Sequence, residues 1–282
     1  MTGTKITLGG LPITAPTEAI THASILLWGA AGTGKSTLAM TAPGDILNIQ
    51  FDQTGAQGVS DIVKNAGEDC NIYVARFNQE SDNVVTKFTS PDPIGIEKFL
   101  TENPNIKTVV FDSLTSFGDK ALAFGVTKAR ATPKGRTATL EDPGYSGYGH
   151  KRTYVEQCVR NLAVSCAKHN VNVIFIAHEG PPTVNNEGVV TERTLLLGAS
   201  LNITIPKDIG EIWYLADTGK ERRLYIRNSG PIRPMRSRIF YTENVQHFKL
   251  NFDADKWSGT GIADWLAMWK ANEFKKINPS KE

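Results

Sequence analysis

One short stretch of the chain carries the residue types that hold a nucleotide phosphate. It fits the pattern G-x-x-x-x-G-K-[ST], in which glycines let the backbone curl around a phosphate with its N–H groups pointing inward. The start of a helix at the loop adds partial positive charge. In this pattern Lys35 reaches the β- and γ-phosphates, and the Ser36 hydroxyl binds Mg²⁺. The predicted nucleotide ligands are Gly29, Ala30, Ala31, Gly32, Thr33, Gly34, Lys35, Ser36 and Thr37.

A second candidate ligand ends a run of β-branched and apolar residues. Residues 108–113 read Thr-Val-Val-Phe-Asp-Ser, which is typical of a buried parallel strand that ends in a carboxylate. Asp112 would hold Mg²⁺ together with Ser36, directly or through water. The alternative is a core strand whose Asp only caps the next helix. The position of the run after a phosphate-binding loop favours the metal-binding interpretation.

A third candidate group, His178-Glu179, follows the apolar run from Val171 to Ala177. Ligands of open α/β sheets bind at the carboxyl ends of the strands, so we expect this pair near the nucleotide. We predict that His178 senses the γ-phosphate. The alternative is a histidine that only satisfies a local hydrogen bond.

Strands and helices that would position these groups alternate along the chain. Apolar runs predict strands at 24–28, 46–51, 71–77, 108–112, 171–177 and 211–216. Helices are expected at 36–40, 94–100, 114–127, 154–167 and 262–270, with weaker signals for a strand at 6–8 and a helix at 56–65. Residues 222–228 are expected to pair back on 211–216 as a hairpin. The chain therefore predicts an α/β fold with a mostly parallel central sheet, helices on both faces and an antiparallel hairpin at the C-terminal edge.

Two long segments lack a clear periodicity and are predicted to be irregular loops. Residues 180–206 form one, closed by Pro206. Residues 128–149 form the other, and their cationic and aromatic side chains suit a single-stranded DNA backbone with base stacking. The alternative for this second loop is a solvated surface. The candidate DNA ligands in it are Lys128, Arg130, Lys134, Arg136 and Tyr148.

Composition excludes several classes of protein. The chain has 282 residues and a formal net charge of +2, so total charge alone does not indicate nucleic-acid binding. Three cysteines without a C-x-x-C pair argue against a disulfide framework and against zinc. Apolar runs fall short of the roughly 18 residues that a membrane-spanning helix needs, so no membrane association is expected.

The order of these features resembles the RecA-core ATPases of bacteriophages, close to the phage single-strand-annealing and recombination ATPases and often described simply as AAA-family proteins. The resemblance spans residues 25–240. It divides the chain into an N-terminal lead-in at 1–23, an ATPase core at 24–240 and a helical extension at 241–282. The motifs that carry it lie at 29–37, 52–55, 109–113, 147–149, 174–179 and 236–238.

The resemblance implies an ATPase that uses ATP and Mg²⁺, binds single-stranded DNA and assembles as a homo-oligomer, either a ring or a filament. It further implies a cytoplasmic location in a bacterial host if the chain is phage-encoded, with a phage or host single-strand-binding protein as a candidate partner. Two arginines would act in trans on a neighbouring subunit's γ-phosphate, although closely spaced arginines also serve as a solvated guard of an edge strand. The implied catalytic residues are Lys35, Asp52, His178, Glu179, Arg236 and Arg238.

One motif departs from the family pattern. Members often carry Asp-x-Glu-Gly after the second strand, and this chain has Asp52-Gln53-Thr54-Gly55. If Thr54 occupies the glutamate position, Asp52 or Glu179 must activate the water, or hydrolysis is slow. The leading hypothesis is ATP-driven annealing or strand exchange on single-stranded DNA, with hydrolysis that DNA stimulates. Two alternatives stay open, namely a slow or non-catalytic ATP switch that partners a helicase or nuclease, and a P-loop small-molecule kinase.

Overall fold

The computed structural model describes residues 7–8, 11–12, 22–52, 62, 64, 71–77, 83–240 and 245–271. The helix expected at 56–65 falls largely outside these residues, as do Gln53, Thr54 and Gly55. Near the N-terminus, β1 (Thr7–Leu8) pairs with β2 (Leu11–Pro12) in a small antiparallel ladder.

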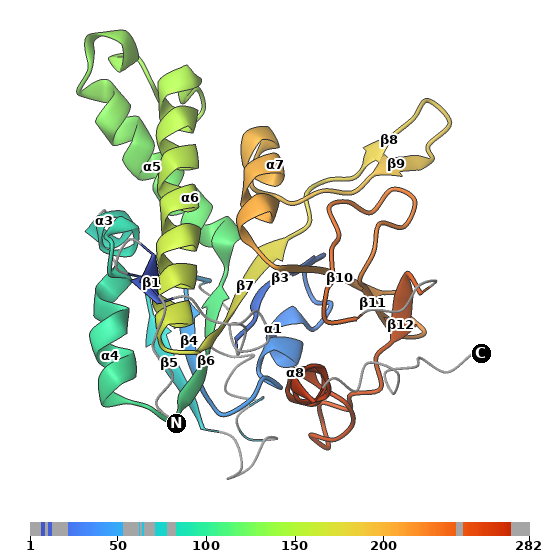
Figure 1. The fold of residues 1–282 in the computed structure, drawn as a ribbon. Coiled ribbons are helices and arrows are strands. Elements are labelled where there is room, and N and C mark those ends of the chain that lie inside the picture. Colours follow the sequence, from blue (N-terminus) through green and yellow to red (C-terminus); the bar gives the residue numbers. More distant parts are fainter. Residues whose placement is uncertain are drawn as a thin grey trace.

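An eight-stranded sheet forms the centre of the fold, in the order β12-β11-β10-β3-β7-β6-β4-β5. The strands from β10 to β5 run parallel, whereas β11 and β12 add antiparallel pairings at one edge (Figure 1). This sheet confirms the predicted fold class, including the hairpin edge. The strands are β3 (Ser24–Gly29), β4 (Asp45–Gln50), β5 (Ile72–Arg76), β6 (Ile106–Asp112), β7 (Asn172–His178), β10 (Glu211–Asp217), β11 (Arg222–Tyr225) and β12 (His247–Lys249).

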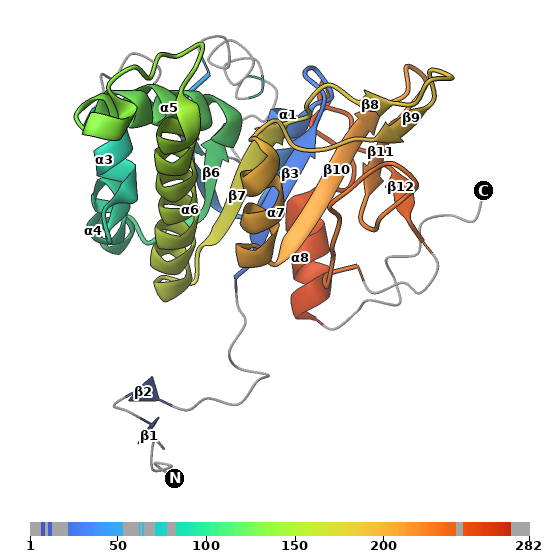
Figure 2. The same cartoon turned by 90° about the horizontal axis from the view of Figure 1, so that it is seen from above.

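Helices cover both faces of the sheet (Figure 2). The group from α3 to α7 packs on one face, and α1 and α8 pack on the other. Among the described helices, none combines the length and the apolarity needed to cross a membrane. Their bounds are α1 (Lys35–Ala39), α3 (Asn83–Thr89), α4 (Ile96–Glu102), α5 (Leu114–Arg130), α6 (Gly144–Lys168), α7 (Ala199–Asp208) and α8 (Ile262–Lys270).

Alternation along each strand divides the core between these two layers. In β3, Leu26 and Trp28 face the α3–α7 layer, whereas Ile25 and Leu27 face α1 and α8. The ring of Trp28 contacts that of Tyr214 on β10, with centroids 4.5 Å apart. Because strands buried on both faces are mostly apolar, the apolar runs in the sequence identify these strands.

The segment predicted as a loop at 128–149 is helical at both of its ends, so the prediction is wrong for residues 128–130 and 144–149, whereas residues 131–143 are irregular apart from one 3₁₀ turn. The helix α5 continues to Arg130 and α6 already begins at Gly144, leaving a short tip with a 3₁₀ turn at Pro133–Gly135. Gly147 of this segment and Gly125 of α5 serve close packing of the two helices. A Cβ on Gly125 would lie 2.9 Å from both the Gly147 carbonyl oxygen and the His150 Cβ, so only glycine lets the two helices approach this closely.

The predicted irregular segment at 180–206 also contains regular structure. A small antiparallel hairpin joins β8 (Thr183–Val184) to β9 (Val190–Glu192), and α7 follows it. Pro206 lies inside α7 rather than after it. The helix forms despite this proline because Leu201 and Ile205 are buried against the sheet.

Residues 245–271, which the sequence assigns to a C-terminal extension, contribute to the central layers. The strand β12 joins the sheet through β11, and α8 covers the α1 face. Trp265 of α8 is buried and lies edge-on to Trp213 of β10. This tryptophan therefore packs α8 against the sheet.

The contact between α5 and α6 yields a stability prediction. Gly125→Ala should lower the free energy of unfolding by about 1–3 kcal/mol, because the added methyl forces the helices apart. Gly149→Ala on α6 is the matched control. Its Cβ would meet nothing within 4 Å, so it should stabilise the protein by up to about 1 kcal/mol through helix propensity. Urea denaturation of both variants tests the packing, and equal effects would contradict it.

Candidate nucleotide-binding site

The phosphate loop lies between β3 and α1, as the motif requires. Gly32 and Gly34 adopt φ angles of 76° and 92°, which glycine reaches without steric cost. Gly29 lies so close to the neighbouring strand that a Cβ would collide with the Leu215 carbonyl oxygen. These positions explain why glycines recur in the loop and why a compact backbone cradle forms there.

Lys35 is buried at the centre of this cradle. Its Nζ donates hydrogen bonds to the carbonyl oxygens of Gly29 and Ala30, at 3.0 and 2.6 Å. Burial lowers the pKa of Lys35 to about 8, although the nearby carboxylates of Asp112 and Asp52 act in the opposite direction. The hydrogen bonds that hold this buried ammonium go to neutral carbonyl oxygens. A negatively charged phosphate would stabilise it more strongly, so the loop fits a nucleotide.

The predicted Mg²⁺ ligands lie together. The Ser36 Oγ donates a hydrogen bond of 2.7 Å to Oδ2 of Asp112, which is only 3% exposed. Burial raises the pKa of Asp112 to about 6, and the charge of Asp52 raises it further. A carboxylate beside a hydroxyl is the oxygen donor set that Mg²⁺ takes, and the cation would offset the cost of burying the charge. The pair therefore fits the metal.

Asp52 forms a second carboxylate centre beside Asp112. Its Oδ1 accepts hydrogen bonds from the hydroxyls of Ser113, at 3.2 Å, and Ser116, and its Oδ2 lies 3.5 Å from the His178 Nε2. Burial alone would raise the pKa of Asp52, but the interactions with His178 and Ser116 outweigh it and lower the pKa. Asp52 therefore stays ionised at neutral pH.

Sequence reasoning missed the two serines that hold Asp52, although a signal was present. Ser113 is also the N-cap of α5, and its hydroxyl accepts a hydrogen bond from the Ser116 backbone N–H at 3.2 Å. The spacing Ser-x-x-Ser directly after Asp112 is typical of a helix start. The sequence did not show that Asp52, which follows a different strand, lies within hydrogen-bonding distance of these two serines.

Glu179 occupies a different environment from His178. Its side chain is 5% exposed, and its two carboxylate oxygens bind the Arg193 guanidinium at 2.5 Å and the Tyr214 hydroxyl at 2.7 Å. The hydrogen bond from Arg193 to Glu179 raises the pKa of Arg193. Neither partner was foreseen, because the two contacts join residues 14 and 35 positions apart, which is beyond the reach of a local sequence pattern.

The two arginines predicted to act in trans lie at the amino end of β10, away from the phosphate loop of their own chain. The Arg236 guanidinium donates hydrogen bonds to the carbonyl oxygens of Pro206 and Ile209, so it closes the end of α7. Arg238 has an exposed side chain, and its backbone N–H binds Oε1 of Glu211 at 2.7 Å. Their role in trans stays a prediction.

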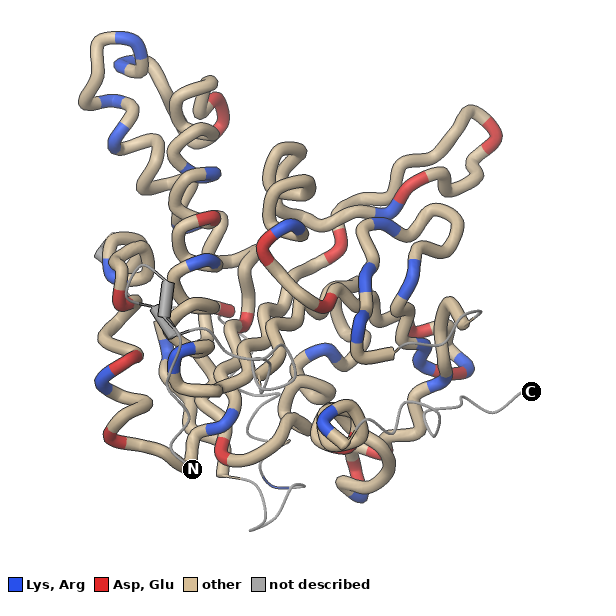
Figure 3. Tube along the Cα trace, viewed as in Figure 1, with Lys and Arg blue, Asp and Glu red and all other residues tan. Residues whose placement is uncertain are grey.

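The predicted DNA ligands gather on the α5–α6 hairpin, away from the phosphate loop, and all of them are exposed. The hairpin rises beyond the sheet, and Lys and Arg positions cluster at its tip (Figure 3). The Lys128 Nζ lies 5.0 Å from the centre of the Phe124 ring, and the Arg130 Nε donates a 2.6 Å hydrogen bond to the Ala138 carbonyl. Lys134 and Arg136 lie in the tip itself, and Tyr148 lies on the first turns of α6.

A family model described as "AAA domain" matches residues 21–232. The chain belongs to the AAA domain family. Its AAA domain includes the phosphate loop, Asp52, Asp112, His178 and the α5–α6 hairpin, and ends before Arg236 and Arg238. Among solved structures, the crystal structure of the RadB recombinase is similar, with 14% sequence identity and a TM-score of 0.47 over 83% of this chain and 90% of that chain. No curated protein matches the sequence.

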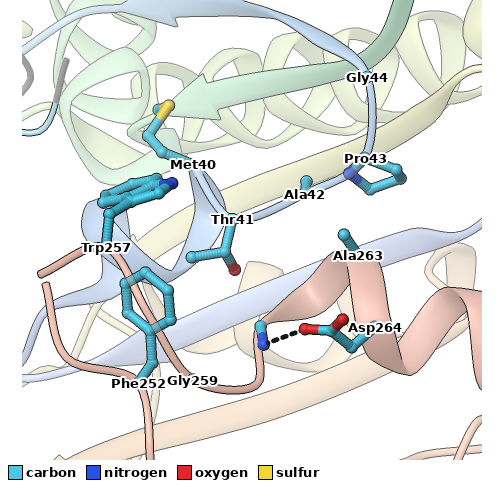
Figure 4. Close-up of a pocket in the computed structure, with 11 residues that line it drawn as sticks. Met40, Thr41, Ala42, Pro43, Gly44, Phe252, Trp257, Gly259, Ala263 and Asp264 are labelled. Carbon is cyan, nitrogen blue, oxygen red and sulfur yellow. Dashed lines mark hydrogen bonds between the residues drawn. The ribbon is translucent and has the colours of Figure 1, made fainter. Parts of the chain in front are cut away.

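A separate cavity of about 300 Å³ lies at the opposite end of α1 from the phosphate loop (Figure 4). Asp264 caps α8 beside it, accepting a 2.8 Å hydrogen bond from the Gly261 N–H. None of the predicted site residues lines this cavity, so it is not part of the AAA domain's nucleotide site. Its lining residues are Met40, Thr41, Ala42, Pro43, Gly44, Phe252, Trp257, Gly259, Gly261, Ala263 and Asp264.

This geometry predicts distinct losses for two substitutions. Lys35→Ala should weaken ATP binding by at least about tenfold, because a charge-assisted phosphate contact is lost. Asp112→Asn should remove most of the gain in ATP affinity that Mg²⁺ gives the wild type, because the metal loses its carboxylate. Calorimetric titration with and without Mg²⁺ measures both. Lys98→Ala, on the exposed face of α4, is the control, and the same losses in it would contradict the assignment.

Proposed function

We propose that this AAA domain is a RecA-like ATPase that binds single-stranded DNA and couples ATP to annealing or strand exchange. The observation that carries the proposal is the convergence of Lys35, the Ser36–Asp112 pair and the Asp52–His178 pair at one edge of the sheet. A phosphate cradle, a metal site and a charged pair for the attacking water together suit phosphoryl transfer to water.

Each residue has a distinct part in the proposed reaction. The loop amides and Lys35 hold the β- and γ-phosphates, and Ser36 and Asp112 hold the metal, which would neutralise charge on the phosphate oxygens. Asp52 orients a water molecule for in-line attack on the γ-phosphate and accepts its proton. His178, in contact with Asp52, lies where it would sense whether the γ-phosphate is present.

The contacts of the strand end after His178 support coupling to a second site. The His178 carbonyl oxygen accepts a 2.8 Å hydrogen bond from the Leu196 N–H, and Glu179 pairs with Arg193. Both partners follow the β8–β9 hairpin and precede α7. A shift of His178 would therefore be passed to these two elements, which rise beyond the same edge of the sheet as the α5–α6 hairpin (Figure 1).

Exposed side chains on the α5–α6 hairpin support single-stranded DNA as the partner. Lys128, Arg130, Lys134 and Arg136 supply four positive charges against Glu141 and Asp142, a local excess of 4 − 2 = 2 in a chain of net charge +2. Flat and apolar groups stand beside these charges, and a hollow of about 240 Å³ lies between the 3₁₀ turn and the start of α6. Such groups stack on bases while cations follow the phosphates. The exposed apolar residues there are Leu140 (57%), Tyr145 (98%) and Tyr148 (56%).

A slow ATP switch that loads a helicase or nuclease is a second candidate. The low pKa of Asp52 favours it, because a carboxylate with a low pKa is a weak general base.

Homo-oligomerisation with Arg238 acting in trans, and contact with a single-strand-binding protein, belong to the first proposal. A small-molecule kinase has no comparable support from the contacts of the described residues.

Turnover separates the two candidates. Asp52→Asn should lower kcat by about 10²–10⁴-fold with little change in ATP affinity, because the substitution removes the base and keeps the shape. Asp255→Asn, on an exposed turn, is the matched control. ATPase assays with and without oligo-dT test this. A wild type that binds ATP but hydrolyses it no faster than Asp52→Asn would support the switch instead.

DNA binding is tested at the hairpin tip. Neutralising Lys134 and Arg136 together should weaken oligo-dT binding and lower the slope of log Kd against log salt by about 1.4, since each lost phosphate contact removes about 0.7. The control removes two other exposed lysines that form surface ion pairs, Lys98 and Lys256. Fluorescence anisotropy over a salt series measures both pairs. Equal effects of the two pairs would contradict a DNA site at the tip.

A further inference from the structure

An arginine outside the predicted site lies against the phosphate loop. Arg222 is the first residue of β11, which returns along β10 after the 218–221 turn. A Cβ built on Gly34 would lie 3.2 Å from the Arg222 Nη1 and 3.3 Å from its Cζ. The guanidinium therefore rests on the glycine that directly precedes Lys35.

The strand fixes the direction of this side chain. Leu224, two residues later, is buried in the layer that contains α1, so Arg222 points to the α1 face of the sheet. Arg223 points to the opposite face, where its Nε pairs with Glu221 at 2.6 Å. Neighbouring arginines thus serve different surfaces, and only Arg222 faces the phosphate loop.

The present partner of Arg222 is a weak one. Its Nε lies 3.5 Å from Oδ2 of Asp217, the residue directly opposite on β10, and the two side chains are 43% and 39% exposed. An exposed ion pair at this distance holds a guanidinium only loosely. A phosphate offers more negative charge and an oxygen spacing that matches the planar fork of arginine.

We infer that Arg222 is a phosphate-binding residue of the nucleotide site, supplied by the β10–β11 hairpin of the same chain. It exchanges Asp217 for the phosphates of a nucleotide held in the loop. This inference rests on the proposed nucleotide binding. Lys35 then contacts the phosphates from inside the loop and Arg222 from its outer side. Arg222 would therefore bind the nucleotide of its own chain, whereas Arg236 and Arg238 are predicted to act on the nucleotide of a neighbouring subunit.

Titrations of ATP, ADP and AMP against the wild-type protein and its variants test this assignment. Arg222→Ala should weaken ATP binding by about 10–100-fold, AMP binding by much less, and ADP binding by an intermediate factor. Arg222→Lys should recover only part of the loss, because an ammonium lacks the fork. Arg223→Ala removes the same charge from the opposite face and should bind all three nucleotides like the wild type.

Two outcomes would overturn the inference while nucleotide binding itself stands. The first is that Arg222→Ala binds ATP with nearly the affinity of the wild type, although Lys35→Ala binds it much more weakly. The other is an equal loss for ATP, ADP and AMP, which would make Arg222 a brace of the loop rather than a phosphate ligand. Wild-type protein that binds ATP no better than Lys35→Ala would instead remove the proposed function and this inference together. Thermal melting shows whether each variant is folded. If Arg222→Ala is unfolded, Arg222→Lys is used for the same comparison.

Discussion

Parallel pairing of β3, β7 and β6 is the constraint on which the rest of this structure depends. Because the strands run in the same direction, their carboxyl ends meet at one edge, and Gly29 aligns with His178 while Asp112 aligns with Ile176. The strand β7 lies between β3, which leads into the phosphate loop, and β6, which ends in Asp112. A change of register in any of these pairs would move the phosphate loop, the Ser36–Asp112 pair and His178 apart.

Two of the charged groups at this edge, Lys35 and Asp112, are buried without full compensation of their charge. Lys35 and Asp112 both lose water, and burial shifts both of their pKa values toward the neutral form. Asp52 keeps its charge because serine hydroxyls and His178 surround it. The site therefore has cationic and anionic groups prepared for a ligand that brings phosphates and a divalent cation, rather than a set of pairs that already satisfy one another.

The central sheet and the metal pair were predictable from the sequence because their signals are local. Apolar runs define the strands, and the glycine and lysine spacing defines the loop. The first turns of α6 were predicted as part of a loop because glycine and proline indicate turns in isolation, whereas Gly147 lies in a close contact with Gly125 of α5. The partners of Glu179 and Asp52, and the position of Arg222, come from residues remote in the chain, which no local pattern specifies.

The hydrogen bond from Tyr214 to Glu179 has an optical consequence. The ring of Tyr214 contacts Trp28, which is fully buried and directly precedes Gly29. Tyr214, which binds Glu179 at the end of β7, thus contacts an indole at the base of the phosphate loop. Intrinsic fluorescence from this indole, isolated by replacing the chain's other tryptophans with phenylalanine, would register events at the cradle without an attached dye.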